Sequence, residues 1–303
     1  MDTSRVCLID ANNYLFRAYH AIPAMHAPDG EPVNATYGFA RTLLKLLRER
    51  EPRYVAALFE SGASFREELA ASYKANRPEP PDDLVPQFLS ARRVTSALGI
   101  PGLEVDGFEA DDLMGTLATR LSVRGLEVLL VSGDKDLAQL VAPGITLLDV
   151  AKNRELDEEG VTERFGVRPD QIIDYLALVG DPVDNIPGLP GVGPKTAQAL
   201  LAAAGSLDAL LARPGQIAEL GIRGHRRVLA ALEEVGEQLH LSRRLATIRR
   251  DVPVDVDVPD LEYHGARRRE LEPLFDRLGF GARIRGEIRR WAPEPSSTGR
   301  LDL

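Results

Sequence analysis

The sequence predicts an α/β fold: a mostly parallel, twisted sheet with helices on both faces, followed by a helical module. Three observations predict it. Short apolar runs at residues 5–10, 54–59 and 128–131 have the length and composition of buried parallel strands. Segments with helical character separate these runs, as in a doubly wound sheet. From residue 170 onward the pattern becomes entirely helical.

The first half of the chain therefore alternates between expected strands and helices. The expected helices lie at residues 12–20, 34–48, 64–75, 84–98 and 109–122, and two further short strands lie at 100–105 and 145–148. The polar helix at 64–75 runs into a proline cluster, Pro78 to Pro81, which can continue neither a helix nor a strand. We therefore expect a flap segment at about residues 61–86.

The second half reads as helices joined by glycine-rich turns, at residues 171–179, 195–204, 206–211 and 226–246. The domain boundaries that follow are an α/β domain at 1–169 and a helical module at 170–290, with a helix-hairpin-helix at 186–197. Residues 291–303 are rich in Pro, Ser and Gly, and we expect a disordered tail there.

The bulk composition indicates a cytoplasmic protein. With 303 residues and 44% hydrophobic side chains, the chain can bury a substantial core, and its single cysteine, Cys7, excludes a disulfide framework. No segment resembles a signal peptide or a membrane span. Nothing in the sequence suggests more than a monomer.

The net charge of −9 at first argues against a nucleic-acid partner. The charge is uneven, however, because residues 1–187 carry 30 Asp and Glu against 19 Lys and Arg, whereas the remaining residues carry 16 against 18. Bound divalent ions would offset much of the acidic excess. The total charge therefore does not decide the partner.

Carboxylates follow three of the expected strands. Asp10 and Glu60 each end an apolar run, and Asp134 and Asp136 follow a third run. A single carboxylate at such a place often only caps the next helix or turn. The carboxyl ends of parallel strands share one edge of the sheet, however, so all four should meet in one cleft.

Two further acid groups add to this set. Glu109, Asp111 and Asp112 begin a helix, where the macrodipole favours one or two acids but does not require three, and Asp181 and Asp184 follow a helix end. Turn chemistry alone would also accept Asp181 and Asp184. Nine carboxylates held close together need cations, and two divalent ions, Mg²⁺ or Mn²⁺, are the simplest solution.

A glycine turn opens the expected helix after residue 193. In Gly191-Val-Gly193-Pro-Lys195-Thr196, the glycines let backbone N–H groups approach a phosphate, aided by the helix N-terminus and Lys195. A Gly-x-Gly alone is weak evidence. With the preceding helix and the Pro-Lys-Thr helix start, the segment predicts a helix-hairpin-helix that grips a DNA backbone.

The flap segment supplies cations and an aromatic ring at helical spacing, namely Arg66, Tyr73, Lys74 and Arg77. A solvated helix face is the usual explanation for such a mixed-charge stretch. Its place directly after a site-bearing strand favours a second explanation, in which the cations hold a substrate phosphate and Tyr73 stacks on a base.

At these motifs the chain resembles the 5′ nuclease domain of bacterial DNA polymerase I and the wider flap endonuclease family. The resemblance covers Val6 to about Phe280 and includes Leu8-Ile-Asp10, Phe65-Arg66, Tyr73-Lys74-Ala-Asn-Arg77-Pro, Glu109-Ala-Asp111-Asp112, Gly133-Asp134-Lys-Asp136, Gly180-Asp181-Pro-Val-Asp184 and Gly191-Val-Gly193-Pro-Lys195. It implies a PIN-like fold and a metal-dependent phosphodiesterase. The implied substrate is DNA with a free 5′ end or a 5′ flap, cut as an exonuclease or an endonuclease.

The resemblance also implies roles for single residues. Asp10, Glu109 and Asp111 would hold one divalent ion, and Asp134, Asp136 and Asp181 a second, with Asp112 and Asp184 acting through water and Glu60 beside them. Lys74 and Arg77 would stabilise charge on the scissile phosphate. DNA contacts are expected from Arg17, Arg66, Tyr73, Lys74, Arg77, Gly191, Gly193, Lys195 and Thr196, and the hairpin would hold K⁺ through backbone carbonyls.

Two departures from the family pattern affect the interpretation. The family usually has Asp where this chain has Glu60, and the extra methylene displaces a carboxylate where Mg²⁺ demands tight geometry. The chain also stops at Leu303 without a polymerase domain, so we expect a stand-alone form served by a separate DNA polymerase and ligase. Two alternatives stay open: a catalytically weakened DNA-structure-binding protein, and a metal-dependent RNA nuclease, which would leave the hairpin unexplained.

Overall fold

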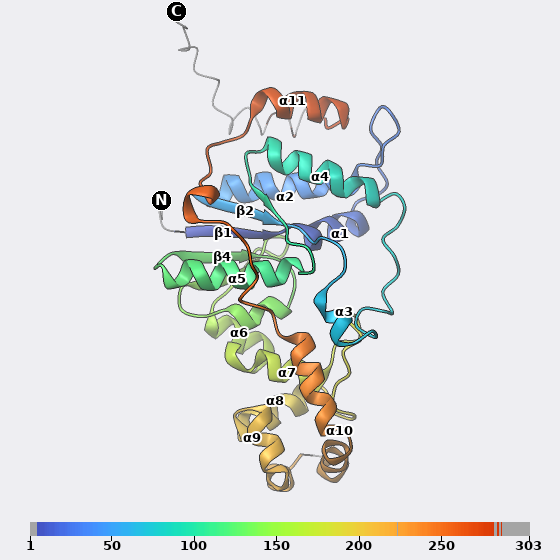
Figure 1. The fold of residues 1–303 in the computed structure, drawn as a ribbon, viewed down its shortest axis with the longest axis vertical. Coiled ribbons are helices and arrows are strands. Elements are labelled where there is room, and N and C mark those ends of the chain that lie inside the picture. The colour runs from blue at the N-terminus through green and yellow to red at the C-terminus, as the bar shows by residue number, and fades with distance from the viewer. Residues whose placement is uncertain (1–4, 223, 282–283, 285, 287–303) are drawn as a thin grey trace, which may run out of the picture.

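A six-stranded sheet forms the centre of the computed structural model, which describes residues 5–222, 224–281, 284 and 286 (Figure 1). The strands are β1 (Arg5–Asp10), β2 (Tyr54–Leu58), β3 (Gly102–Leu103), β4 (Glu127–Val131), β5 (Ile145–Asp149) and β6 (Arg154–Leu156). Their order is β3-β2-β1-β4-β5-β6, and only β6 runs antiparallel to its neighbour. The mostly parallel sheet that the sequence predicts is therefore confirmed.

One face of the sheet is covered by α1 (Ala11–Ala21), α2 (Asn34–Arg50), α4 (Val85–Ala97) and α11 (Arg268–Arg277). Side chains alternate along a strand, so Cys7 and Ile9 of β1 point to this face. They join one apolar cluster with Leu15 of α1, Phe39 of α2 and side chains of α4 and α11. Helices α1 and α2 lie side by side in this layer (Figure 1).

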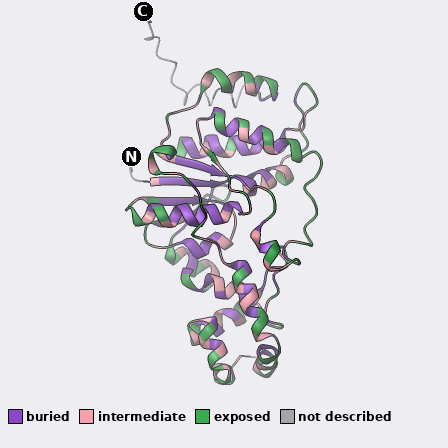
Figure 2. Cartoon of the chain, viewed as in Figure 1, coloured by how far each residue is buried: buried purple, intermediate pink, exposed green. Residues whose placement is uncertain are grey.

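The opposite face is covered by α5 (Ala110–Val123), which packs on Val6 and Leu8 of β1. The apolar cluster on this face continues without a break into the helical part of the chain. Figure 2 shows buried residues in both parts. That part contains α6 (Glu158–Phe165), α7 (Ile172–Val179), α8 (Pro194–Ala204), α9 (Leu207–Ala212) and α10 (His225–Ala246). Sheet and helices thus share one core on this side.

Short elements complete the fold. They are α3 (Phe65–Leu69) and the 3₁₀ helices η1 (Asp136–Leu140), η2 (Pro169–Gln171), η3 (Pro214–Leu220) and η4 (Val258–Leu261). Helix α10 is kinked at Val235, whose φ of −119° is not helical. Among the described residues, no helix has both the length and the apolar character that crossing a membrane requires.

The flap segment differs most from its prediction. The expected helix at 64–75 ends at Leu69, because Ala70 is extended and Lys74 has a left-handed φ of 54°. Residues 71–76 instead form turns. Strand β6 and helices α6 and α11 lie where no element was predicted, and the tail predicted at 291–303 lies outside the described residues.

The strand register brings the predicted acids to one edge. Asp10 at the end of β1 pairs with Leu58 at the end of β2, and Ile9 pairs with Val131 at the end of β4. The loops that follow these strands therefore emerge together, with Asp10, Glu60 and Asp134 at the carboxyl edge of the sheet.

Candidate metal centre

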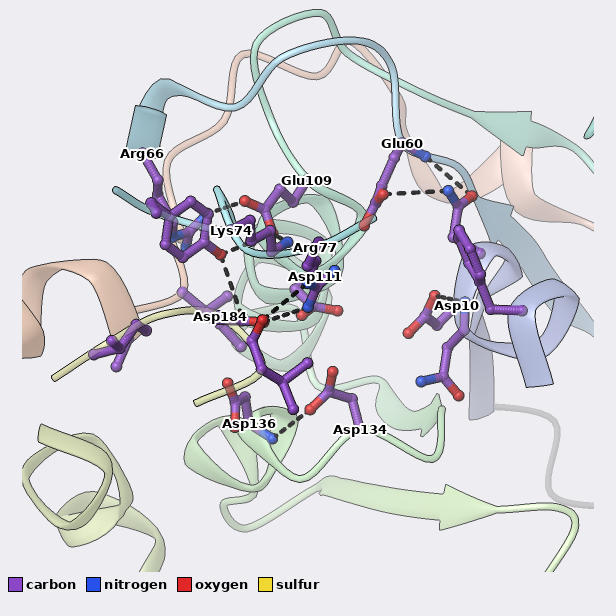
Figure 3. A pocket seen from close by; sticks show the side chains of 18 of the residues that line it. Asp10, Glu60, Arg66, Lys74, Arg77, Glu109, Asp111, Asp134, Asp136 and Asp184 are labelled. Atoms are coloured by element: carbon purple, nitrogen blue, oxygen red, sulfur yellow. Dashed lines mark hydrogen bonds and ion pairs between the residues drawn. The ribbon is translucent and has the colours of Figure 1, made fainter. Parts of the chain in front are cut away.

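A cavity of about 510 Å³ opens at the carboxyl edge of the sheet (Figure 3). Of the nine predicted acids, seven line it: Asp10, Glu60, Glu109, Asp111, Asp134, Asp136 and Asp184. They come from three strand ends, from the start of α5 and from the loop after α7. The convergence expected from the strand pattern is thus present in the structure.

Asp10 is held rigidly. It caps α1, with Oδ1 accepting from the backbone N–H of Asn13 at 2.9 Å, and its Oδ2 accepts from the Ser132 hydroxyl at 2.7 Å. The Ser132 hydroxyl in turn accepts from the backbone N–H of Asp134 at 3.0 Å. The ends of β1 and β4 are therefore tied together through the carboxylate that the cavity exposes.

Asp112 is turned away from the cavity. It is fully buried, with 0% of its surface exposed, and receives two hydrogen bonds from the Arg66 guanidinium at 2.7 and 2.8 Å. The backbone N–H of Arg249 donates a third at 2.8 Å. The structure does not bring Asp112 into the acid group, because adjacent helix positions point in different directions.

Arg66 is equally committed to the interior. Only 3% of it is exposed, and besides Asp112 it donates to the backbone carbonyls of Leu245 and Thr247 at 2.8 Å each. Arg66 borders the acid cavity with this small exposed fraction, and the expected DNA contact from it stays a prediction. Arg66 instead ties α3, α5 and the end of α10 together.

A second acid subset lies across the cavity. Asp136, Asp181 and Asp184 each offer a carboxylate oxygen within 4.8 Å of the others. Asp181 does not line the cavity itself and pairs with Lys135 at 2.8 Å. Asp136 Oδ1 is buried without a hydrogen-bond partner among the described residues, although a buried carboxylate oxygen normally has one. A cation fits this place chemically.

Two flap cations already neutralise part of the site. Lys74 forms an ion pair with Glu109, and Arg77 forms one with Asp184 (Figure 3). Tyr73 is only 5% exposed, and its hydroxyl donates toward Glu109 Oε2 at 3.3 Å. The ring is thus packed inside the protein, and the expected base stacking on Tyr73 does not agree with this placement.

Burial, together with the remaining negative charge, raises several pKa values. Burial, followed by the nearby Glu60 and Asp134 charges, raises the pKa of Asp10 to about 7. Burial and neighbouring carboxylates also raise the pKa of Asp111 and Asp136 well above the ordinary range, and burial raises that of Asp134. The cations near these carboxylates do not balance their negative charge. Their oxygens are ligands that hard divalent cations prefer.

Sequence reasoning missed several residues of the cavity. The Asn12 amide donates to Glu60 at 3.3 Å, Asn13 and Ser132 position Asp10, and Phe16 and His20 line the wall. Lys135, between two predicted ligands, had no predicted role either, and it pairs with Asp181 outside the cavity lining. The Asn12-Asn13 pair, one residue beyond Asp10, was the available signal, because the first residues of a helix beside a strand end face the same crevice.

The hairpin predicted for DNA lies between α7 and α8 and follows directly on Asp181 and Asp184. Asp181 exchanges two backbone hydrogen bonds with Ile186 at 2.8 Å each, and Ile186 lines the acid cavity. Gly180 and Gly188 cross so closely that a Cβ on Gly180 would lie 2.5 Å from the Gly188 nitrogen. Gly191 has a φ of 81°, and a Cβ at Gly193 would meet nothing within 4 Å, so the turn is open to a ligand. Gly193 caps α8, and Lys195 is exposed beside Thr196 in its first turn.

Arg17, also expected at the DNA, lines the acid cavity from α1. Its guanidinium pairs with Asp149 at 3.0 Å. It therefore borders the site without contacting the acids of the candidate metal centre.

Comparison with known proteins adds sequence relatives. DNA polymerase I of Pseudomonas aeruginosa is 46% identical over 92% of this chain and 31% of its own length. The thermostable DNA polymerase I of Thermus thermophilus is 38% identical over 92% of this chain and 32% of its own length. The chain thus spans about a third of the length of these relatives.

Solved structures show the same fold. The T5 D15 protein co-crystallised with metal ions has a TM-score of 0.64 at 21% identity, covering 80% of this chain and 88% of that chain. The catalytic core of Rad2 in complex with DNA substrate has a TM-score of 0.64 at 17% identity, covering 95% of this chain and 92% of that one.

Family models cover both parts of the chain. Residues 5–166 match the N-terminal resolvase-like domain of the 5′-3′ exonucleases, and residues 167–269 match their C-terminal SAM fold. With the acid cavity at the sheet edge, these matches show that the chain belongs to the 5′-3′ exonuclease family.

Proposed function

We propose that this protein is a divalent-metal-dependent 5′-3′ nuclease that hydrolyses phosphodiester bonds in DNA near a free 5′ end or at a 5′ flap. The observation that carries the proposal is the acid cavity, where carboxylates with raised pKa values gather beside Lys74 and Arg77. Family membership supports the reaction class. The relatives named DNA polymerase I and the Rad2 structure with DNA substrate support DNA as the substrate.

The residues divide into two candidate ligand groups. Asp10, Glu109 and Asp111 would hold one Mg²⁺ or Mn²⁺, and Asp134, Asp136 and Asp181 would hold a second, near Asp184. When bound, such ions activate a water molecule and stabilise the leaving oxygen. Ser132 and Asn13 orient Asp10 for this role, and Asn12 holds the Glu60 side chain toward the cavity.

Lys74 and Arg77 would change their partners when divalent ions bind. In the structure they neutralise Glu109 and Asp184. Once divalent ions compensate those carboxylates, the two cations would be available to a substrate phosphate and to the negative charge that develops on it.

The hairpin would hold the duplex. Gly191, Gly193, Lys195 and Thr196 present backbone N–H groups and a cation at the start of α8, and K⁺ bound by hairpin carbonyls would attract the phosphates further. A separate polymerase and ligase would complete a repair reaction. We propose that the domain boundary lies near residue 170 and that the protein acts as a monomer.

A cleavage assay tests the proposal. The protein is incubated with Mg²⁺ or Mn²⁺ and with labelled 5′-flap DNA, blunt duplex DNA or single-stranded RNA, and the products are mapped. We expect cleavage of the DNA substrates near the 5′ end and none of the RNA. Cleavage of RNA alone would contradict the proposal.

The variant Asp134→Ala separates chemistry from binding. We expect cleavage to fall at least roughly 1,000-fold, because a ligand of the candidate metal centre is lost, while the affinity for flap DNA changes little. Affinity measured in Ca²⁺ by fluorescence anisotropy checks this. Loss of binding together with activity, in a folded variant, would contradict the division between the acid cavity and the hairpin.

A second candidate function is DNA-structure binding without cleavage, which the lengthened Glu60 side chain favours. Tight binding of flap DNA without products in either metal would support it. The other eight predicted acids are all present as Asp or Glu, which argues for retained catalysis.

A further inference from the structure

Lys135 is a cation placed between two predicted metal ligands, Asp134 and Asp136, and the proposed mechanism gives it no role. Its ammonium lies 2.8 Å from Oδ2 of Asp181, which belongs to the second acid subset, Asp136, Asp181 and Asp184. The Lys135 side chain is 42% exposed, whereas that of Asp181 is 8% exposed. A lysine therefore neutralises a nearly buried carboxylate at the place where a divalent ion is expected.

The Asp181 carboxylate itself is fixed. Its Oδ1 accepts a hydrogen bond from the backbone N–H of Val183 at 2.8 Å. Its backbone N–H and carbonyl form hydrogen bonds with Ile186, at 2.8 Å each. The Lys135 ammonium is thus the one described partner of this carboxylate that can leave without breaking the backbone structure of the loop.

The backbone around Lys135 is fixed as well. The backbone N–H of Asp134 donates to the Ser132 hydroxyl at 3.0 Å, and that of Asp136 donates to Asp134 Oδ1 at 2.9 Å (Figure 3). The side chain of Lys135 can turn toward solvent, but its attachment to this loop keeps the ammonium within reach of Asp181. A tethered group of this kind competes at a high effective concentration.

The two candidate metal sites differ in how many carboxylates pair with a protein cation. In the second acid subset two of the three do, because Lys135 holds Asp181 and Arg77 holds Asp184. In the other group, only Glu109 forms an ion pair among the described residues. We call this other group the first acid group: Asp10, Glu109 and Asp111. A divalent ion therefore displaces fewer protein cations at the first acid group than at the second acid subset.

Lys135 and a divalent ion compete for Asp181. If both bound this carboxylate, two positive centres would lie close together and repel each other. Mg²⁺ also demands near-octahedral geometry, and hydrogen-bond donors already occupy both oxygens of Asp181. Asp136 Oδ1, buried without a hydrogen-bond partner among the described residues, offers the ion a free ligand. One such oxygen does not complete the coordination of a divalent ion.

We propose that Lys135 is an intramolecular competitor of the divalent ion at the second acid subset. Its ammonium has to leave Asp181 before the ion binds there, so the second ion binds more weakly than the first. Lys135 thereby sets the concentration of free Mg²⁺ or Mn²⁺ at which the two-ion state forms. The inference rests on the proposed function, because it takes a site for two divalent ions as given.

Binding of Mn²⁺ to the protein without DNA tests the inference. Electron paramagnetic resonance of the free Mn²⁺ counts the bound ions and gives a Kd for each. The variant is Lys135→Met, which keeps an unbranched side chain and removes the charge. We expect the Kd of the weaker ion to fall roughly 3- to 10-fold, because no ion pair has to be broken. The Kd of the tighter ion should change less than about twofold.

Two control variants separate the position of the charge from its shape and from the net charge. Lys135→Arg keeps a positive charge and should bind the weaker ion with a Kd within about twofold of wild type. Lys152→Met removes a matched lysine that pairs with Asp149 at 3.2 Å, where the Asp149 side chain is 6% exposed. Lys152 does not line the acid cavity, so both Kd values should stay within about twofold of wild type.

Asp136→Asn assigns the effect to the second acid subset. Loss of this ligand should weaken the second ion beyond the measured range. Adding Lys135→Met to this variant should then leave the remaining Kd unchanged within about twofold. Circular dichroism melting checks that each variant is folded, and Lys135→Gln replaces Lys135→Met if the latter melts early.

Three results would overturn the inference: an unchanged Kd of the weaker ion in Lys135→Met, an equal fall of both Kd values, or a fall of the same size in Lys135→Arg. Retention of the second ion in Asp136→Asn would also overturn it. Wild-type protein that binds two Mn²⁺ ions and cleaves flap DNA would leave the proposed function intact in each case. Wild-type protein that binds fewer than two ions and cleaves no DNA would overturn both.

Discussion

Arg66 and Asp112 form a buried ion pair, and Arg66 also donates to the backbone carbonyls of Leu245 and Thr247. Removing one partner of such a pair leaves an uncompensated buried charge. Arg66→Met should therefore lower the free energy of unfolding by about 3–5 kcal/mol. Urea denaturation followed by circular dichroism measures this loss.

The double variant Arg66→Met with Asp112→Leu serves as its control. It removes both charges and should recover a large part of the lost stability, because no lone charge remains. If Arg66→Met instead kept full stability and weakened DNA binding, Arg66 would be a DNA contact, as the sequence pattern first indicated.

The raised pKa of Asp10 in the acid cavity should lower the free energy of unfolding as the pH rises. A carboxyl whose pKa is raised in the folded protein, such as Asp10 at about 7 against an ordinary 3.8, binds more protons when folded than when unfolded. Its contribution to stability is therefore lost as the pH rises from about 4 to 7. In EDTA, the ionisation of Asp10 should lower the melting temperature by several degrees as the pH rises through this window.

Mg²⁺ should reverse the loss, because it binds the ionised carboxylates of the folded state. The difference in melting temperature between Mg²⁺ and EDTA is thus expected to grow as the pH passes through about 7. Differential scanning calorimetry of the wild type and of Asp10→Asn measures it. A difference that is constant with pH in the wild type would show that these carboxyls are not the ligands.

Among the elements, the flap segment is held by backbone and amide hydrogen bonds to the loop after α7. The Asn76 amide donates to the Pro182 carbonyl at 2.7 Å, and the Asn185 amide donates to the Ser72 carbonyl at 2.7 Å. The backbone N–H of Lys74 donates to the Asp184 carbonyl at 3.0 Å. These bonds place Lys74 and Arg77 over the acids.

Removing the two amides should loosen the flap. In Asn76→Ala with Asn185→Ala, we expect cleavage of flap DNA to slow roughly tenfold, because Lys74 and Arg77 lose their positions. Proteolysis between residues 70 and 83 should become faster, while the melting temperature changes little. Limited trypsin digestion with mass spectrometry checks this, and an unchanged digestion rate would contradict the role of the amides.

The same segment shows why its structure escaped prediction. Its sequence has helical spacing, but hydrogen bonds to residues more than 100 positions away override that local preference after Leu69. Strands β1, β2 and β4 were predictable because they are buried on both faces and read as continuous apolar runs. The three-residue strand β6 has no such signal.

The site was predictable where topology alone decides it. Asp10, Glu60 and Asp134 had to share an edge once their strands were parallel neighbours. The orientation of Asp112 and the burial of Tyr73 depend on how α3, α5 and α10 pack together, which no local pattern encodes. Contacts between distant segments therefore account for what the sequence did not reveal.

Across the whole chain, one apolar core joins the sheet to the helices that carry the hairpin. Buried side chains form a continuous cluster from Leu8 and Leu130 in the sheet, through Leu113 of α5, to Leu201 of α8 and Leu210 of α9. Residues 5–166 and residues 167–269 should therefore unfold together, because neither region can lose the other without exposing this core.

Leu201→Ala tests this coupling. The side chain is fully buried in α8, so its truncation should cost about 2–5 kcal/mol. If unfolding is shared, the slowest-exchanging amides of β1 and β4 should lose the same free energy of protection as those of α8 in native-state hydrogen exchange. Val123→Ala, at a side chain that is 83% exposed, should change neither. Faster hydrogen exchange confined to the amides of α7 to α10 would show that these helices unfold on their own. The hairpin could then release DNA without disturbing the acid cavity.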